Sequence, residues 1–267
     1  MMGARVRQPY PWKIFGVLFG AGLLATLALL PYLGELSRRI AAHTERPVPH
    51  LGIVQIVLAL FQSAIFLAFE TGFGLLLASR VGLTVPLLSA WLYGRYGQRR
   101  LWSVLFRSIV AGLLSASIAV GVLVWVFVPR IPQILAASEY QYPLWKRFLA
   151  ALYGGIAEEI LMRLFVMTLL VWLLSRILHE ADGLPSPVAL WASNIIAAVL
   201  FGLGHLPMGV ALGIPVNALV IADAVTVNGV IGATCGWLYI NWGFEGAMIA
   251  HFCADVVLHV IGPYFVH

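Results

Sequence analysis

Long and almost uninterrupted apolar runs constrain this chain more than any other feature of its sequence. Only 10% of the 267 residues are charged and 61% are hydrophobic, whereas about 25% of the residues of an average soluble protein are charged. Apolar runs of about 18 residues or more can cross a lipid bilayer as helices. We therefore expect an all-α, polytopic integral membrane protein.

The apolar runs predict about eight transmembrane helices that enclose a polar cavity inside the membrane. They cover residues 14–34, 52–79, 104–129, 148–178, 187–204, 208–223, 226–242 and 244–264. The stretch 208–242 is rich in glycine and could also hold one long and one short helix. Residues 80–100 combine apolar side chains and Trp91 with four arginines, which is typical of a segment that lies on the membrane surface. We expect a single transmembrane domain over residues 1–267.

The composition also narrows the expected partners. The net charge of +5 does not indicate nucleic-acid binding, because the basic residues are scattered between apolar runs. Cys235 and Cys253 lie in apolar segments, so we expect two packed thiols and no disulfide. The N-terminal apolar run is too long for a typical signal peptide and is expected to stay as the first span. The lipid bilayer is the first expected partner, and we expect it to be the bacterial cytoplasmic (inner) membrane.

Three charged residues lie close together in the middle of the run at 148–178, in the segment EEILMR. Each would cost roughly 3 kcal/mol if it faced lipid, so all three must face inward, pair or line water. Glu159 and Arg163 are spaced i, i+4 on one helix face, which predicts an ion pair. Glu158 lies about 100° around the helix and is predicted to stay available. An ion-pair cluster that only stabilises helix packing would explain the motif equally well.

Two later apolar runs carry histidines. FGLGH ends the fifth run with His205, and HFCAD in the last run places His251 and Asp255 at i, i+4 on one face. Either motif alone is as compatible with packing as with function. Two acids, an arginine, two histidines and an aspartate on three apolar segments are together the ingredients of a hydrolytic centre.

In their order and character, EEILMR, FGLGH and HFCAD resemble the EExxxR, FxxxH and HxxxN motifs of the CPBP intramembrane proteases. That family includes the CAAX-processing endopeptidases and bacteriocin-processing relatives. The resemblance covers a core of about residues 146–260, and it departs from the usual pattern at Asp255, where asparagine is more common. It implies a glutamate-type intramembrane protease that acts on a membrane-embedded or membrane-delivered peptide. Nothing in the sequence indicates that this peptide is prenylated.

The resemblance also implies a division of roles. Glu158 and His205 would activate a water for attack on a peptide carbonyl, and His251 would stabilise the oxyanion. Glu159 and Arg163 would hold the site together.

Asp255 needs a separate interpretation. An ionised carboxylate would repel an oxyanion, so we expect Asp255 to orient an imidazolium at His251. A protonated, buried Asp255 is the alternative.

No cofactor is expected, but two alternatives stay open. One is a zinc-dependent protease with a site built from His205, His251 and a glutamate, although no HExxH motif occurs. The other is a non-catalytic membrane scaffold, immunity or transport protein that uses the same buried charges. A transporter would be expected to have repeated halves with broken helices, and the sequence contains no such repeat.

Overall fold

The computed structural model describes residues 10–45, 52–94 and 98–265, and this part of the chain contains helices and no β-strand. Within it, six helices are long and apolar enough to cross a membrane. They span Trp12–Thr44, Ile53–Val81, Leu101–Phe127, Pro187–Ala211, Ala218–Trp242 and Phe244–Phe265. The predicted class, an all-α polytopic integral membrane protein, is confirmed.

The helices follow one another with short connections. In chain order they are α1 Trp12–Thr44, α2 Ile53–Val81, α3 Pro86–Leu92, α4 Gln98–Val122, η1 Leu123–Phe127, α5 Gln133–Ala137, α6 Leu144–Tyr153, η2 Gly154–Glu158, η3 Ile160–Met167, α7 Thr168–Leu174, α8 Pro187–Gly204, α9 Leu206–Ala211, α10 Ala218–Trp242, α11 Phe244–Asp255, η4 Val256–Ile261 and η5 Gly262–Phe265.

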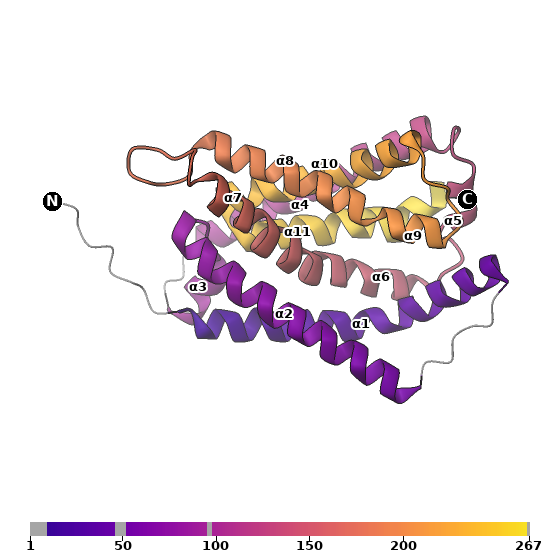
Figure 1. Cartoon of the computed structure of the whole chain (residues 1–267), viewed down its shortest axis with the longest axis horizontal. Coiled ribbons are helices and arrows are strands. Elements are labelled where there is room, and N and C mark those ends of the chain that lie inside the picture. Colours follow the sequence, from indigo (N-terminus) through magenta and orange to yellow (C-terminus); the bar gives the residue numbers. More distant parts are fainter. Residues whose placement is uncertain (1–9, 46–51, 95–97, 266–267) are drawn as a thin grey trace.

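The α6–α7 segment and α11 run through the middle of the bundle (Figure 1). Helices α1 and α2 cover one side of them and α8 and α10 the other, with α4 behind α11. The loop 175–186 marks one end of the bundle, and α5, α9 and η5 gather at the opposite end. The central segments are the ones that carry EEILMR and HFCAD.

The glycine-rich stretch 208–242 forms one short and one long helix, rather than the two spans 208–223 and 226–242. Asn217 caps α10 by accepting hydrogen bonds from the backbone amides of Leu219 and Val220. The helix then continues for 25 residues, and its glycines mark close packing instead of a break. A Cβ at Gly232, for example, would lie 3.2 Å from Cα of Ala198 on α8.

The predicted span 148–178 is helical from Leu144 to Leu174, but its middle is not an α-helix. Elements η2 and η3 are π-helical, so their backbone hydrogen bonds skip one residue more than in an α-helix. Local π-helical turns are frequent at functional sites. The surface segment predicted at 80–100 contains the short helix α3 with Trp91 exposed, and its residues 95–97 lie outside the described part.

Candidate active site

The two adjacent glutamates of EEILMR occupy different environments. The side chain of Glu159 is fully buried, and its Oε1 lies 2.8 Å from Nη1 of Arg163. Glu158 keeps 30% of its side chain exposed and lines a cavity inside the bundle. The predicted ion pair is therefore confirmed, and Glu158 is the acid that faces the cavity.

Arg163 is held in place from two further sides. Its guanidinium carbon lies 4.9 Å from the centre of the Phe201 ring, a distance at which an aromatic face attracts a cation. Gly232 leaves room for the guanidinium, since a Cβ there would approach Nη2 to 3.1 Å. The buried charge of Glu159 is thus paired with a cation that is itself held in place.

His251 is buried among three carboxylates. Its Nδ1 donates a hydrogen bond of 2.6 Å to Oε1 of Glu159. Its Nε2 lies 3.4 Å from Oδ1 of Asp255 and 3.9 Å from Oε2 of Glu158. Asp255 contacts one ring nitrogen, so the orienting role predicted for it stays a prediction. The imidazole is also oriented by Glu159, through the opposite nitrogen. Sequence spacing could not show this, because residues 159 and 251 lie on different helices.

His205 follows the last residue of α8. Its Nδ1 donates to the carbonyl oxygen of Phe201 at 2.8 Å, because a carbonyl can only accept. In the neutral ring, Nε2 then carries the lone pair and can accept a proton. The Phe201 ring lies edge-on to both His205 and His251, with centroid distances of 4.8 Å and 5.4 Å. Phe201 thus positions both imidazoles, a role that the sequence analysis missed.

Two glycines explain how the glutamate segment approaches α11. A Cβ at Gly154 would collide with Oδ2 of Asp255 and lie 3.4 Å from Nε2 of His251. A Cβ at Gly155 would lie 2.7 Å from Cβ of Phe252. Only glycine at these two positions lets η2 pack directly against α11. In the sequence, this close packing could have been predicted from the pair of glycines, Gly154 and Gly155, that precedes the two glutamates.

The cavity has a volume of about 650 Å³, and residues of α1, α6, η2, η3, α8, α10, α11 and η4 are among those that line it. Glu158, His205, His251 and Asp255 all line it. The structure thus brings at least one residue of each of the three motifs to the same cavity. Glu139, Asp223 and His259 also line this cavity, and the sequence analysis gave none of them a functional role.

Glu139, in the connection between α5 and α6, lines the cavity and belongs to a second polar cluster. Its carboxylate accepts hydrogen bonds from the Tyr32 hydroxyl and, at 3.0 Å, from Nδ1 of His259. Burial acts to raise the pKa of the Glu139 carboxyl, but His259, Tyr32 and Arg147 outweigh it and hold that pKa below its ordinary value. This cluster joins α1, the 138–143 connection and η4.

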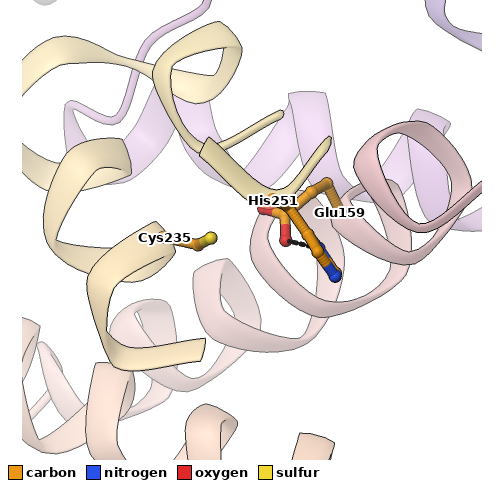
Figure 2. Close-up of side chains that lie close together, drawn as sticks. All are labelled: Glu159, Cys235 and His251. Carbon is orange, nitrogen blue, oxygen red and sulfur yellow. Dashed lines mark hydrogen bonds and ion pairs between the residues drawn. The ribbon is translucent and has the colours of Figure 1, made fainter. Parts of the chain in front are cut away.

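A possible metal-ligand set lies next to the cavity. Glu159, Cys235 and His251 offer ligand atoms within 4.8 Å of one another, the one such set among the described residues (Figure 2). Neither Glu159 nor Cys235 lines the cavity, and Glu159 already contacts Arg163 and His251 through Oε1. His205, part of the zinc site considered from the sequence, does not belong to the set.

Comparison with known proteins places the site inside a matched region. Residues 140–257 match a family model described as Type II CAAX prenyl endopeptidase Rce1-like. No curated protein and no solved structure matches the chain. The matched region contains EEILMR, FGLGH and HFCAD, and it nearly coincides with the core of about 146–260 delimited from the motifs.

Proposed function

We propose that this chain, whose residues 140–257 match the model of the Rce1-like CAAX prenyl endopeptidases, is an intramembrane endopeptidase. It would hydrolyse a peptide bond in a substrate that is embedded in the membrane or delivered by it. The observation that carries the proposal is that Glu158, His205 and His251 line one cavity within the matched helices. The family match supports peptide hydrolysis as the reaction. The shared cavity supports Glu158, His205 and His251 as the residues of the active site.

The first step would be activation of a water. Of the two adjacent glutamates, Glu158 faces the cavity and Glu159 pairs with Arg163, so the carboxylate of Glu158 is the one that can take a proton. Nε2 of His205 has a free lone pair in the neutral ring and would accept the second hydrogen bond of the same water. As Glu158 removes the proton, the water oxygen bonds to the peptide carbon and the carbonyl electrons move onto its oxygen.

The second step would be collapse of the tetrahedral intermediate. A doubly protonated His251 donates Nδ1–H to Glu159 and has Nε2–H left for the oxyanion. Asp255 contacts that nitrogen at 3.4 Å, a long distance for a hydrogen bond. The oxyanion would take over this contact as it forms. The oxyanion electrons then re-form the C=O bond as the C–N bond breaks, and Glu158 returns its proton to the departing amine.

Glu159 and Arg163 would act as positioning residues. Glu159 contacts both Arg163 and His251 through the same oxygen, and the arginine packs on Phe201, which contacts both imidazoles. The pair therefore fixes the geometry of the site without touching the substrate. We propose that the reaction needs no metal, because Glu158 and His205 can activate water directly.

Three reporter peptides would test the proposal in vesicles of phosphatidylcholine. All carry a fluorophore and a quencher, and they are anchored by a farnesylated CAAX end, by a single transmembrane helix, or not at all. We expect the purified chain to cleave at least one anchored peptide and to leave the soluble one uncut. Failure of a folded chain to cleave either anchored peptide would contradict the proposal and favour a non-catalytic scaffold. Fractionation of a bacterial host would test placement in the cytoplasmic (inner) membrane.

A further inference from the structure

The charged groups of the cavity are not balanced. The described residues that line it include four carboxylates and three histidines but no lysine or arginine. Glu139 pairs with His259, while Asp255 and Glu158 lie near His251. Asp223, on α10, is the carboxylate left without any such partner.

Asp223 makes no hydrogen bond or ion pair within the described part of the chain, and its Oδ1 is buried. A buried carboxylate oxygen without a partner is costly, by amounts comparable to the loss of a strong hydrogen bond. Such a group is expected where something absent from the free protein completes it.

The position of Asp223 in its helix gives no structural reason for an acid. It is the sixth residue of α10, beyond the first turn in which a carboxylate would stabilise the helix dipole. The cap of this helix is already provided by Asn217.

Asp223 also lines the same cavity as Glu158, His205 and His251. A Cβ at Gly202 would come within 2.7 Å of the Ala224 carbonyl oxygen and of Cα of Val225. The backbones of α8 and α10 are therefore in contact directly after Asp223. On α8 this contact is at Gly202, three residues before His205. Asn228 lines the same wall, and since its amide nitrogen donates to the Ala224 carbonyl, its oxygen remains available as an acceptor.

We propose that Asp223 is a specificity-determining residue that binds a cationic group of the substrate, a lysine or arginine side chain close to the cleaved bond. The inference rests on the proposed function and names the substrate class of that site. A carboxylate and an amide oxygen both accept hydrogen bonds from an ammonium or guanidinium group, and the carboxylate pairs with its charge. The same wall would disfavour an acidic peptide segment, because the cavity offers no lysine or arginine to neutralise it.

Binding can be measured apart from cleavage in the Glu158→Gln background. The probes are the transmembrane-anchored reporter with an acetylated N-terminus and one lysine placed at each position near the cleaved bond, and matched peptides with glutamine. Charge-assisted hydrogen bonds support a preference of about tenfold or more for lysine at one position. Asp223→Asn should reduce this ratio to near one, and Asp223→Glu should retain part of it. Glu180→Gln, which removes an exposed carboxylate from the loop at the opposite end, should keep the full ratio.

The outcomes distinguish the binding role of Asp223 from the proposed peptidase activity. Equal binding of lysine and glutamine peptides, or a preference that survives Asp223→Asn, would overturn the inference. A preference only for a free, unacetylated N-terminus would overturn the side-chain assignment. Lysine-selective binding that depends on Asp223, without cleavage by the wild-type chain, would support the inference and reject the proposed peptidase.

Discussion

Oε1 of Glu159 lies 2.6 Å from Nδ1 of His251 and 2.8 Å from Nη1 of Arg163. One buried oxygen thus joins the first and last motifs of the site. Since Nδ1 is occupied by this contact, the other ring nitrogen of His251 is directed towards Asp255, Glu158 and the cavity. Glu159, which does not line the cavity, thus determines that Nε2 of His251 is the ring nitrogen directed towards it.

Removing either member of the buried ion pair should damage both folding and activity. Glu159→Ala and Arg163→Ala each leave an uncompensated buried charge, which costs about 3–5 kcal/mol. We expect both variants to melt at lower temperature than the wild type in detergent and to lose cleavage of the reporter peptides. Glu158→Gln is the matched control, because Glu158 is partly exposed and should melt near the wild-type temperature. Equal melting temperatures for all four proteins would contradict this division between the acids.

Gly154 should be intolerant of a methyl group. In Gly154→Ala, the added Cβ meets Oδ2 of Asp255 and approaches Nε2 of His251, so these side chains must shift. A displacement of about 1 Å can cost roughly 10²-fold in rate. Gly121→Ala is the control, because nothing lies within 4 Å of a Cβ at Gly121. Activity loss of similar size in both variants, measured at equal helical content, would show that the contact with α11 is not the cause.

The Glu139 cluster should make stability depend on pH in the acidic range. The pKa of Glu139 is lowered from 4.5 in the folded chain, so its ionised form stabilises the fold above that value. This stabilisation should be lost as pH falls through the folded-state pKa. Between pH 7 and pH 3, the melting temperature of the wild type should therefore fall more steeply than that of Glu139→Gln. Parallel curves for the two proteins would argue against the cluster as the source, and Glu180→Gln should follow the wild type.

Chelation should not inactivate the enzyme. If Glu158 and His205 activate water directly, dialysis against EDTA or phenanthroline should leave the cleavage rate unchanged. Cys235→Ser should also keep metal-independent activity, because Cys235 does not line the cavity. Loss of activity on chelation, restored by added zinc, would instead assign a metal to the reaction. Elemental analysis of the same preparation gives an independent reading.

The sequence predicted those features that depend on local spacing. The membrane class follows from the apolar runs, and the Glu159–Arg163 pair follows from the i, i+4 rule. The contact between Glu159 and His251 could not be predicted in this way, because it depends on how two helices far apart in sequence pack. The π-helical turns of η2 and η3 were not predicted either, because the analysis of hydrophobic periodicity assumes a regular α-helix. Asp223 was missed because an isolated acid belongs to no motif, and only the structure shows that it lines the cavity without a partner among the described residues.

The central claim is that Glu158, rather than Glu159, activates the water, and Glu158→Gln tests it most directly. The measurement is kcat/KM for the best-cleaved anchored reporter, with the wild type and Glu158→Gln compared at equal folded fraction. Loss of the general base should lower kcat/KM by about 10²–10⁴-fold, while the melting temperature stays near that of the wild type. A folded Glu158→Gln variant that cleaves at the wild-type rate would contradict the account.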